Sequence, residues 1–279
     1  MSIFIVIGMA RSGTSFLTGW LNEIGISMGR IFLQPDEIMN EKGFYEDLSF
    51  SNIQRSVNDF NEDLNIDDLR ACPEYKLRFN QEQFTSAMNL LQERDQDNHD
   101  WGWKITAETY RVLSSFWIPA LNACDRLSKA NFVVAFRHYN KSVGSLMRVK
   151  YLKRKKESPL SGWKFKWLSI NRSKNANFFL KEWIEANREI LQYRKDNPSA
   201  NIIFTNTDYL LAKNTKIFEA INAQSTRPLE YISPKDLYDT KLMDRPIDLR
   251  FHLDANLKEE ADAIYNQLVE LMNTQKQLK

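Results

Sequence analysis

Cysteine and histidine are scarce in this 279-residue chain, which contains two cysteines and three histidines. Cys72 and Cys124 lie in unrelated surroundings, and neither belongs to a spacing that is typical of a metal site. A single disulfide at most, in a chain of this length, favours a reducing compartment. The sequence therefore argues against a disulfide-stabilised scaffold, and we expect no bound metal ion.

Long hydrophobic runs and an excess of charge of one sign are also missing. No segment reaches the ~20 apolar residues that a membrane span needs, and the N-terminal apolar run is too short for a signal peptide. We therefore expect a cytoplasmic protein without a transmembrane segment. The formal net charge is only +2, so no overall field indicates a nucleic-acid partner. Any basic function must be local.

Four short apolar runs alternate with patterns of helical period. The expected strands cover residues 4–7, 101–105, 131–136 and 202–205. Helices are expected over residues 14–24, 46–60, 80–94, 108–127 and 176–195. Three further helices are expected to begin near residues 141, 208 and 258. This alternation predicts the α/β class, with a central parallel sheet flanked by helices on both faces. Without repeats or flexible linkers, residues 1–279 are expected to form a single domain.

The segment from Phe4 to Leu21 has the layout of a phosphate-binding loop. An apolar strand leads into a small-residue turn and then into a helix, whose N-terminal N–H groups and dipole favour an anion. Gly8, Gly13 and Ser15 fit the template G-x-x-x-x-G-K-[ST], but Thr14 occupies the lysine position. A cation appears earlier, at Arg11, so the loop suits an anion arranged differently from a triphosphate.

A second candidate anion site follows the clearest buried strand. Arg137 stands at the end of this strand, where a guanidinium can hold a phosphate through two parallel hydrogen bonds. Ser145 comes eight residues later, about two helical turns on, and can return towards the same group. Ligands of open α/β sheets bind at the carboxyl ends of strands, where both motifs lie.

Together these motifs resemble those of the sulfotransferases that use 3′-phosphoadenosine 5′-phosphosulfate (PAPS). Residues 11–15, Arg-Ser-Gly-Thr-Ser, are similar to their 5′-phosphosulfate loop, and the pair Arg137 and Ser145 is similar to their 3′-phosphate motif. The resemblance implies a three-layer P-loop-like fold, PAPS as co-substrate and no metal. The cofactor-binding residues that it implies are Arg11, Ser12, Gly13, Thr14, Ser15, Phe16, Arg137 and Ser145.

The resemblance also implies catalytic residues. Residues 101–104, Trp-Gly-Trp-Lys, are similar to the strand that carries the family's active-site lysine, so Lys104 and Arg11 are expected to stabilise the leaving phosphate. Glu46 is the preferred base, because glycan and tyrosyl sulfotransferases use a glutamate from this part of the chain. A helix-terminal acid stabilised by the dipole is an equally good interpretation of Glu46. Asp47, Glu108 and His138 are the other candidate bases.

Three departures separate the chain from the cytosolic phenol and steroid enzymes of this family. Thr106 stands where they have a histidine base, and Phe16 where they stack adenine on tryptophan. Their C-terminal R-x-G-x-x-G loop is missing, although Arg245 or Arg250 can serve instead. Residues 40–47 resemble a loop of bacterial and some carbohydrate sulfotransferases. The acceptor stays open: a hydroxyl or amine of a glycan, a lipid or a small molecule.

Two other functions compete with this one. A P-loop nucleotide kinase needs a loop lysine and a strand-end carboxylate for magnesium, and the chain has Thr14 and Arg137 there. A non-catalytic module could bind the same phosphoadenosine nucleotide. The basic and aromatic stretch 148–167 is either a solvated segment, a lid, or a surface for peripheral membrane contact or an anionic acceptor.

Overall fold

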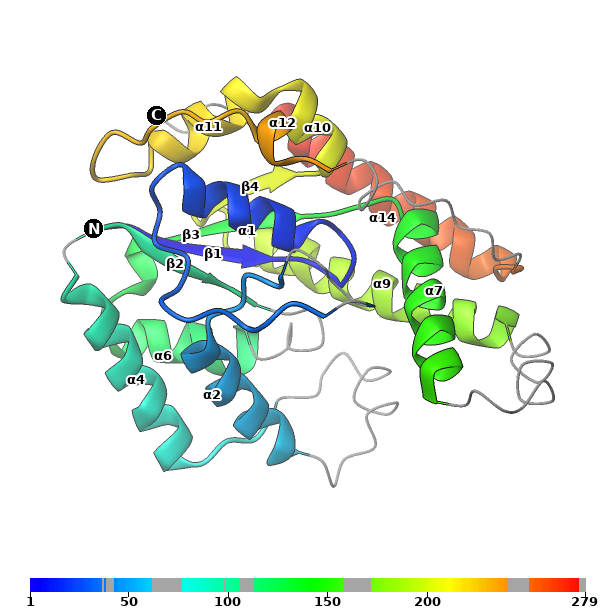
Figure 1. Cartoon of the computed structure of the whole chain (residues 1–279), viewed down its shortest axis with the longest axis horizontal. Helices are drawn as coiled ribbons and strands as arrows, with labels where there is room; N and C mark the ends of the chain where they lie inside the picture. The colour runs from blue at the N-terminus through cyan, green and yellow to red at the C-terminus, as the bar shows by residue number, and fades with distance from the viewer. Residues whose placement is uncertain are drawn as a thin grey trace.

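The computed structural model describes residues 1–36, 38, 43–61, 77–97, 99–105, 113–157, 172–239 and 251–275. The centre of the molecule is a parallel sheet of four strands in the order β2-β1-β3-β4 (Figure 1). The strands are β1 (Ile3–Ile7), β2 (Trp101–Lys104), β3 (Ala130–Ala135) and β4 (Asn201–Thr205). The predicted α/β class is therefore confirmed, and the strands lie where the apolar runs placed them.

Both faces of the sheet are buried under helices, which is why its strands are apolar on both sides. In β1, Ile3, Ile5 and Ile7 pack into one cluster, and Phe4 and Val6 pack into the other. The first cluster is completed by α2 (Leu48–Asp59), α4 (Gln81–Asp95), α6 (Ile118–Ala123), α7 (Tyr139–Glu157), α9 (Arg172–Asp196) and α14 (Ala255–Thr274). The second is completed by α1 (Thr14–Glu23), α10 (Thr207–Ala212), α11 (Asn214–Asn222) and α12 (Pro234–Leu237).

The helix predicted over residues 108–127 is confirmed only in part, because within the described residues a regular α-helix, α6, covers only Ile118–Ala123. Residues 113–117 form a π-helical turn, η2 (Leu113–Trp117), and α6 ends at Ala123 before a short 3₁₀ turn, η3 (Leu127–Lys129). Pro119 lies at the start of α6 and has no N–H to donate to the preceding turn, so the regular helical ladder cannot run through it. Residues 106–112 lie outside the described part.

The helix predicted over residues 46–60 begins later, at Leu48. Asp47 is its N-cap, and its side chain accepts hydrogen bonds from the N–H groups of Ser49 and Phe50 at 2.9 and 3.4 Å. Glu46 therefore precedes the helix. Its carboxylate lies directly before the N-cap rather than in the first turn of α2.

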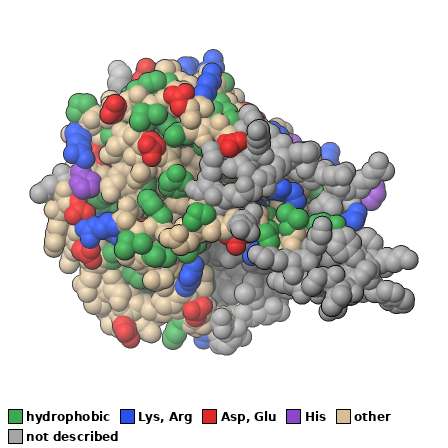
Figure 2. Space-filling view, viewed as in Figure 1, with side chains coloured by type: hydrophobic (Ala, Val, Ile, Leu, Met, Phe, Trp, Pro, Cys, Tyr) green, Lys and Arg blue, Asp and Glu red, His purple; other side chains and the backbone are tan. Residues whose placement is uncertain are grey.

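Within the described ranges, no helix combines the length and apolar character that crossing a bilayer requires. On the face shown in Figure 2, acidic and basic side chains are interspersed over the described surface, in keeping with the nearly balanced charge of the sequence.

Candidate functional site

The turn between β1 and α1 depends on the conformation of Gly13. This residue caps α1 with a φ of 96°, and a Cβ there would lie 2.7 Å from Oγ1 of Thr207, so both backbone and space favour glycine. Ser12 and Thr14 on either side are buried. The first turn of α1 carries no acidic side chain. Because the first N–H groups of a helix point out of its N-terminus, this end can hold an anion.

The two sequence motifs meet at Arg11. Its Nε donates a hydrogen bond of 2.9 Å to Oγ of Ser145, 134 residues away in the chain. Nη1 of Arg137 donates a hydrogen bond of 3.4 Å to the backbone oxygen of Arg11. The backbone oxygen of Arg137 in turn accepts a hydrogen bond of 3.0 Å from Nε1 of Trp183 in α9. Residues of two separate anion motifs thus form one connected group.

Lys104 ends β2 and is buried, with only 4% of its side chain exposed. Its ammonium group contacts three oxygens: Oε1 of Glu46 at 2.9 Å, the backbone oxygen of Phe44 at 2.7 Å and Oγ of Ser15 at 3.2 Å. An ammonium has three N–H donors, so these contacts use its full capacity. Burial lowers the pKa of Lys104, the Glu46 carboxylate opposes this, and Arg11 adds to the lowering.

Glu46 and Asp47 are neighbours with different surroundings. The Glu46 side chain faces Lys104, as described, and lies within the group of candidate site residues. The carboxylate of Asp47 caps α2 and also binds the backbone N–H of Arg30 at 2.7 Å and Nη2 of Arg94 at 2.8 Å. Asp47 is 1% exposed, so its carboxylate oxygens are used in buried hydrogen bonds that stabilise the fold. Of these two candidate bases, only Glu46 contacts the lysine.

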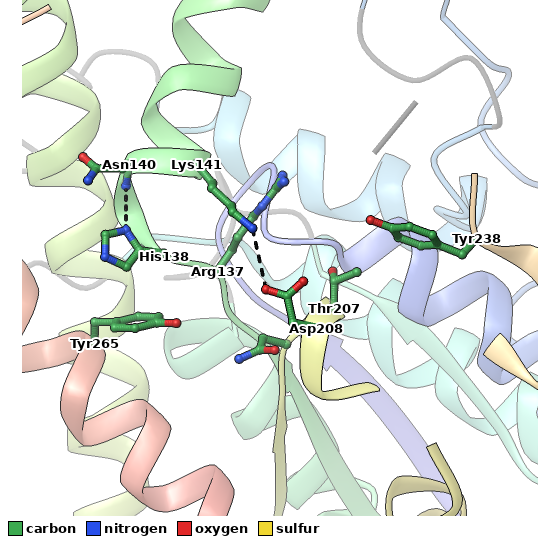
Figure 3. Close-up of a pocket in the computed structure, with 9 residues that line it drawn as sticks. Arg137, His138, Asn140, Lys141, Thr207, Asp208, Tyr238 and Tyr265 are labelled. Carbon is green, nitrogen blue, oxygen red and sulfur yellow. Dashed lines mark hydrogen bonds and ion pairs between the residues drawn. The ribbon is translucent and has the colours of Figure 1, made fainter. Parts of the chain in front are cut away.

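A cavity of about 390 Å³ opens at the carboxyl ends of β3 and β4 (Figure 3). Arg137 forms one wall, and Lys141 lies 3.6 Å from Asp208 across it. Tyr238 and Tyr265 stand on opposite sides of this pair in the view. The remaining lining residues are His138, Asn140, Asn206 and Thr207. The cavity therefore combines cations, a carboxylate, polar groups and aromatic rings, and such placed polar groups can orient a small ligand.

His138 lies in this cavity, on the β3 side of the sheet edge, whereas Lys104 ends β2 on the far side of β1. Its Nδ1 accepts a hydrogen bond of 3.3 Å from the backbone N–H of Asn140. Burial lowers the pKa of His138, and Lys141 and Lys258 lower it further against the opposing effect of Asp262. The structure does not bring His138 to Lys104.

Phe16 lies beside the cavity without being part of its lining. Its ring meets Tyr238 edge-on, with ring centroids 5.4 Å apart. The sequence resemblance assigns Phe16 to the adenine-stacking position, and in the structure Phe16 contacts the lining residue Tyr238. Tyr238 and Tyr265 were missed because they follow no strand. Asn206 to Asp208 directly follow β4, and the rule that ligands bind at strand ends could have found them.

The candidate residues follow the order of the strands along one edge of the sheet. Lys104 ends β2, the turn that carries Arg11 follows β1, Arg137 follows β3, and Asn206 follows β4. Neighbouring strands are about 4.8 Å apart, so the edge spans about 14 Å from β2 to β4. The site is therefore elongated, with the buried lysine at one end and the cavity at the other.

Several sequence predictions lie outside the described residues. They concern Asn40 to Lys42, Thr106, Glu108, residues 158–167 of the basic and aromatic stretch, and Arg245 and Arg250. Among the described residues, no group of three or more His, Cys, Asp or Glu side chains is arranged to hold a metal ion.

Comparison with family models, with curated proteins and with solved structures gives no match to this chain. Its function must be argued from the site itself.

Proposed function

We propose that this protein is a PAPS-dependent sulfotransferase with a P-loop-like fold. The observation that carries the proposal is the 2.9 Å contact between Arg11 and Ser145. These residues come from two motifs whose residue types and spacing indicate the two anionic ends of one nucleotide. The motifs follow the neighbouring parallel strands β1 and β3, so one ligand at this edge of the sheet can reach both. Their contact supports a single ligand that spans both.

The elongated edge gives the donor a natural orientation. The 5′-phosphosulfate lies at the N-terminus of α1, where residues 12–16 and Arg11 surround it. The 3′-phosphate lies against Arg137 and Ser145, and the nucleoside extends towards the cavity beside β4. The sulfonyl group then faces Lys104 and Glu46 at the β2 end. In this orientation the anionic parts of the donor have cationic partners: Arg11 and Lys104 for the phosphosulfate, and Arg137 for the 3′-phosphate.

Lys104 and Arg11 supply the positive charge that the reaction needs. In-line attack forms a bond between sulfur and the acceptor oxygen or nitrogen and breaks the bond between sulfur and the bridging oxygen of the phosphate. Negative charge grows on that bridging oxygen, and preorganised cations in a buried site stabilise it strongly. Since Lys104 already uses three donors, it must release one protein oxygen to reach the ligand.

Of the three oxygens that bind the Lys104 ammonium, the Glu46 carboxylate oxygen is the one whose loss would assist the transfer reaction. When its carboxylate takes the proton from the acceptor, it loses its charge, and its attraction for the Lys104 ammonium weakens. The lysine then directs an N–H to the leaving oxygen as the negative charge develops there. Proton removal at the acceptor and stabilisation of 3′,5′-phosphoadenosine are thereby coupled through the 2.9 Å ion pair.

A transfer assay tests this proposal. The protein is incubated with sulfur-labelled PAPS and a panel of glycans, lipids and small phenols, and the products are analysed by mass spectrometry. We expect a sulfonated product that requires Lys104: Lys104→Ala should lose the activity, and Lys129→Ala, which changes an exposed lysine, should retain it. EDTA should leave turnover unchanged.

The competing functions give different results in the same assay. A nucleotide kinase transfers phosphate from ATP, and EDTA abolishes its activity because phosphoryl transfer needs magnesium. A non-catalytic module binds the phosphoadenosine nucleotide but yields no product with any acceptor. Either outcome would overturn the proposal.

A further inference from the structure

The C-terminal helix α14 packs against the residues that flank Arg137. The ring of Tyr265 meets His138 edge-on at a centroid distance of 4.7 Å and Phe136 at 6.0 Å. One turn earlier in the helix, Asp262 accepts a hydrogen bond of 2.6 Å from the hydroxyl of Tyr139. The helix thus contacts the residue before Arg137 and the two residues after it, although it lies more than 100 positions further along the chain.

The helix itself is firmly attached to the body of the protein. Its buried positions, Ala261, Ile264, Leu268 and Met272, belong to the core cluster under the sheet. At its C-terminal end, the side-chain amide of Gln275 exchanges two hydrogen bonds with the backbone of Phe204 in β4, at 2.8 and 2.9 Å. A side chain on the cavity face of α14 is therefore held in a fixed position at the strand ends.

Tyr265 projects from this helix into the cavity, with its hydroxyl end towards the side where Asp208 lies (Figure 3). None of the described residues exchanges a hydrogen bond with this hydroxyl, whereas the hydroxyl of Tyr139 is bonded to Asp262. Burial and the nearby Asp208 carboxylate raise the pKa of Tyr265, so its phenol stays protonated at neutral pH. It is a hydrogen-bond donor that faces a cavity lined by Arg137 and Lys141.

We infer that Tyr265 is a ligand-binding residue and that α14 forms the outer wall of the nucleotide site. The Tyr265 hydroxyl donates a hydrogen bond to the bound nucleotide, and its ring keeps the Arg137 segment in position through Phe136 and His138. The inference rests on the proposed function and adds a recognition element that neither sequence motif contains.

Substitutions of Tyr265 separate these two contributions. Tyr265→Phe removes only the hydroxyl and keeps the ring contacts, so it should weaken binding of 3′,5′-phosphoadenosine by about 5- to 10-fold, as expected for one hydrogen bond. Tyr265→Ala also removes the ring and should weaken binding further. Tyr193→Phe is the matched control, because Tyr193 is half-buried against Phe132, outside the cavity lining, and should bind as the wild type does.

Affinities are measured by calorimetry for 3′,5′-phosphoadenosine, AMP and magnesium ATP, with the melting temperature of each variant recorded alongside. If Tyr265→Ala fails to fold, Tyr265→Phe decides. Equal affinity of wild type and Tyr265→Phe for 3′,5′-phosphoadenosine would overturn this inference alone. If ATP binds best and depends on the Tyr265 hydroxyl, the inference stands and the sulfotransferase proposal fails. A wild-type protein that binds none of the three contradicts both.

Discussion

At the scale of single residues, the proposed reaction depends on two ionisable groups that share a buried contact. Lys104 and Glu46 lie 2.9 Å apart with side chains 4% and 10% exposed. Removing one member of such a pair leaves the other charge poorly compensated. Their roles are therefore interdependent, and single substitutions must be chosen to keep the shape of the site.

Replacement of Glu46 by glutamine tests its role as the base. Glu46→Gln keeps the side-chain volume and removes the basicity, so turnover should fall by roughly 10²- to 10⁴-fold. Donor binding should survive, because the substitution removes no positive charge from the site and leaves the Lys104 ammonium available to an anionic donor. Steady-state kinetics and calorimetry measure the two effects, with Glu23→Gln on the exposed face of α1 as the control. Near-normal turnover in Glu46→Gln would exclude this carboxylate as the base.

Arg11 should matter more for turnover than for donor binding. In the proposed donor orientation its positive charge faces the phosphosulfate, where negative charge grows in the transition state. Arg11→Ala should therefore lower kcat more than it raises the dissociation constant of the donor. Arg137→Ala should raise the dissociation constant of the donor more than it lowers kcat, since the charge of the 3′-phosphate does not change during the reaction. Kinetics of both variants with PAPS check this, and identical profiles for the two would contradict the division of roles.

At the scale of elements, α2 shows why a local pattern could predict a helix and miss its start. The apolar positions Ile53 and Val57 indicated the helix, but the cap depends on partners distant in sequence. Asp47 is fixed by Arg30 and Arg94, which lie 17 and 47 residues away. The start of α2 therefore depends on long-range contacts that a local pattern does not contain.

The structure predicts that Asp47→Asn destabilises the fold. The substitution breaks a buried ion pair with Arg94 and weakens the cap, and loss of one partner from such a pair costs about 3–5 kcal/mol. We expect a decrease of about 3 kcal/mol in the free energy of unfolding, measured by urea denaturation. Asp59→Asn, at the exposed C-terminal end of the same helix, should have little effect. Equal stability of both variants would show that the Asp47 network contributes little.

The sequence predicted the parts of the site that lie in short local motifs and missed those that depend on long-range packing. The cradle after β1 and the pair Arg137 and Ser145 are short motifs beside strands, so residue spacing alone indicated them. Tyr238 and Tyr265 lie in segments without such a signal and reach the cavity only through long-range packing. The contact of Lys104 with Glu46 also joins residues from β2 and from the turn before α2, which no local pattern relates.

At the scale of the whole molecule, hydrogen bonds to Asp100 link the start of the chain to the loop after α11. This residue is fully buried and accepts hydrogen bonds from the N–H of Ser2 at 2.6 Å and from the N–H and hydroxyl of Thr226, both at 2.8 Å. Ser225 adds a further hydroxyl donor at 2.5 Å. Burial alone would raise the pKa of Asp100, but these donors outweigh it and hold the pKa below its usual range.

This pKa shift makes stability dependent on pH. A carboxylate with a lowered pKa in the folded state stabilises the fold above its unfolded pKa of about 3.9, and this contribution is lost as the pH falls through the folded pKa. Asp100→Asn should therefore lower the free energy of unfolding at pH 7. On acidification below about pH 4, the free energy of unfolding should fall less for this variant than for the wild type. Urea denaturation at pH 7 and pH 3.5 measures this.

The control for this experiment is Asp236→Asn, which changes an exposed aspartate and should follow the wild-type pH profile. A wild type and an Asp100→Asn variant that lose the same free energy between the two pH values would show that Asp100 does not contribute to the acid sensitivity.

Calorimetric titration with 3′,5′-phosphoadenosine and with AMP tests the central claim most directly, because the two ligands differ only in the 3′-phosphate. If Arg137 and Ser145 bind that phosphate, the wild type should prefer 3′,5′-phosphoadenosine by at least 10-fold, since a charge-assisted hydrogen bond contributes about 1.5–3 kcal/mol. Arg137→Ala should remove most of this preference and weaken AMP binding much less than binding of 3′,5′-phosphoadenosine, because Arg137 contacts AMP only as part of the cavity wall. Equal affinity of the wild type for both nucleotides, or tightest binding to magnesium ATP, would contradict the account.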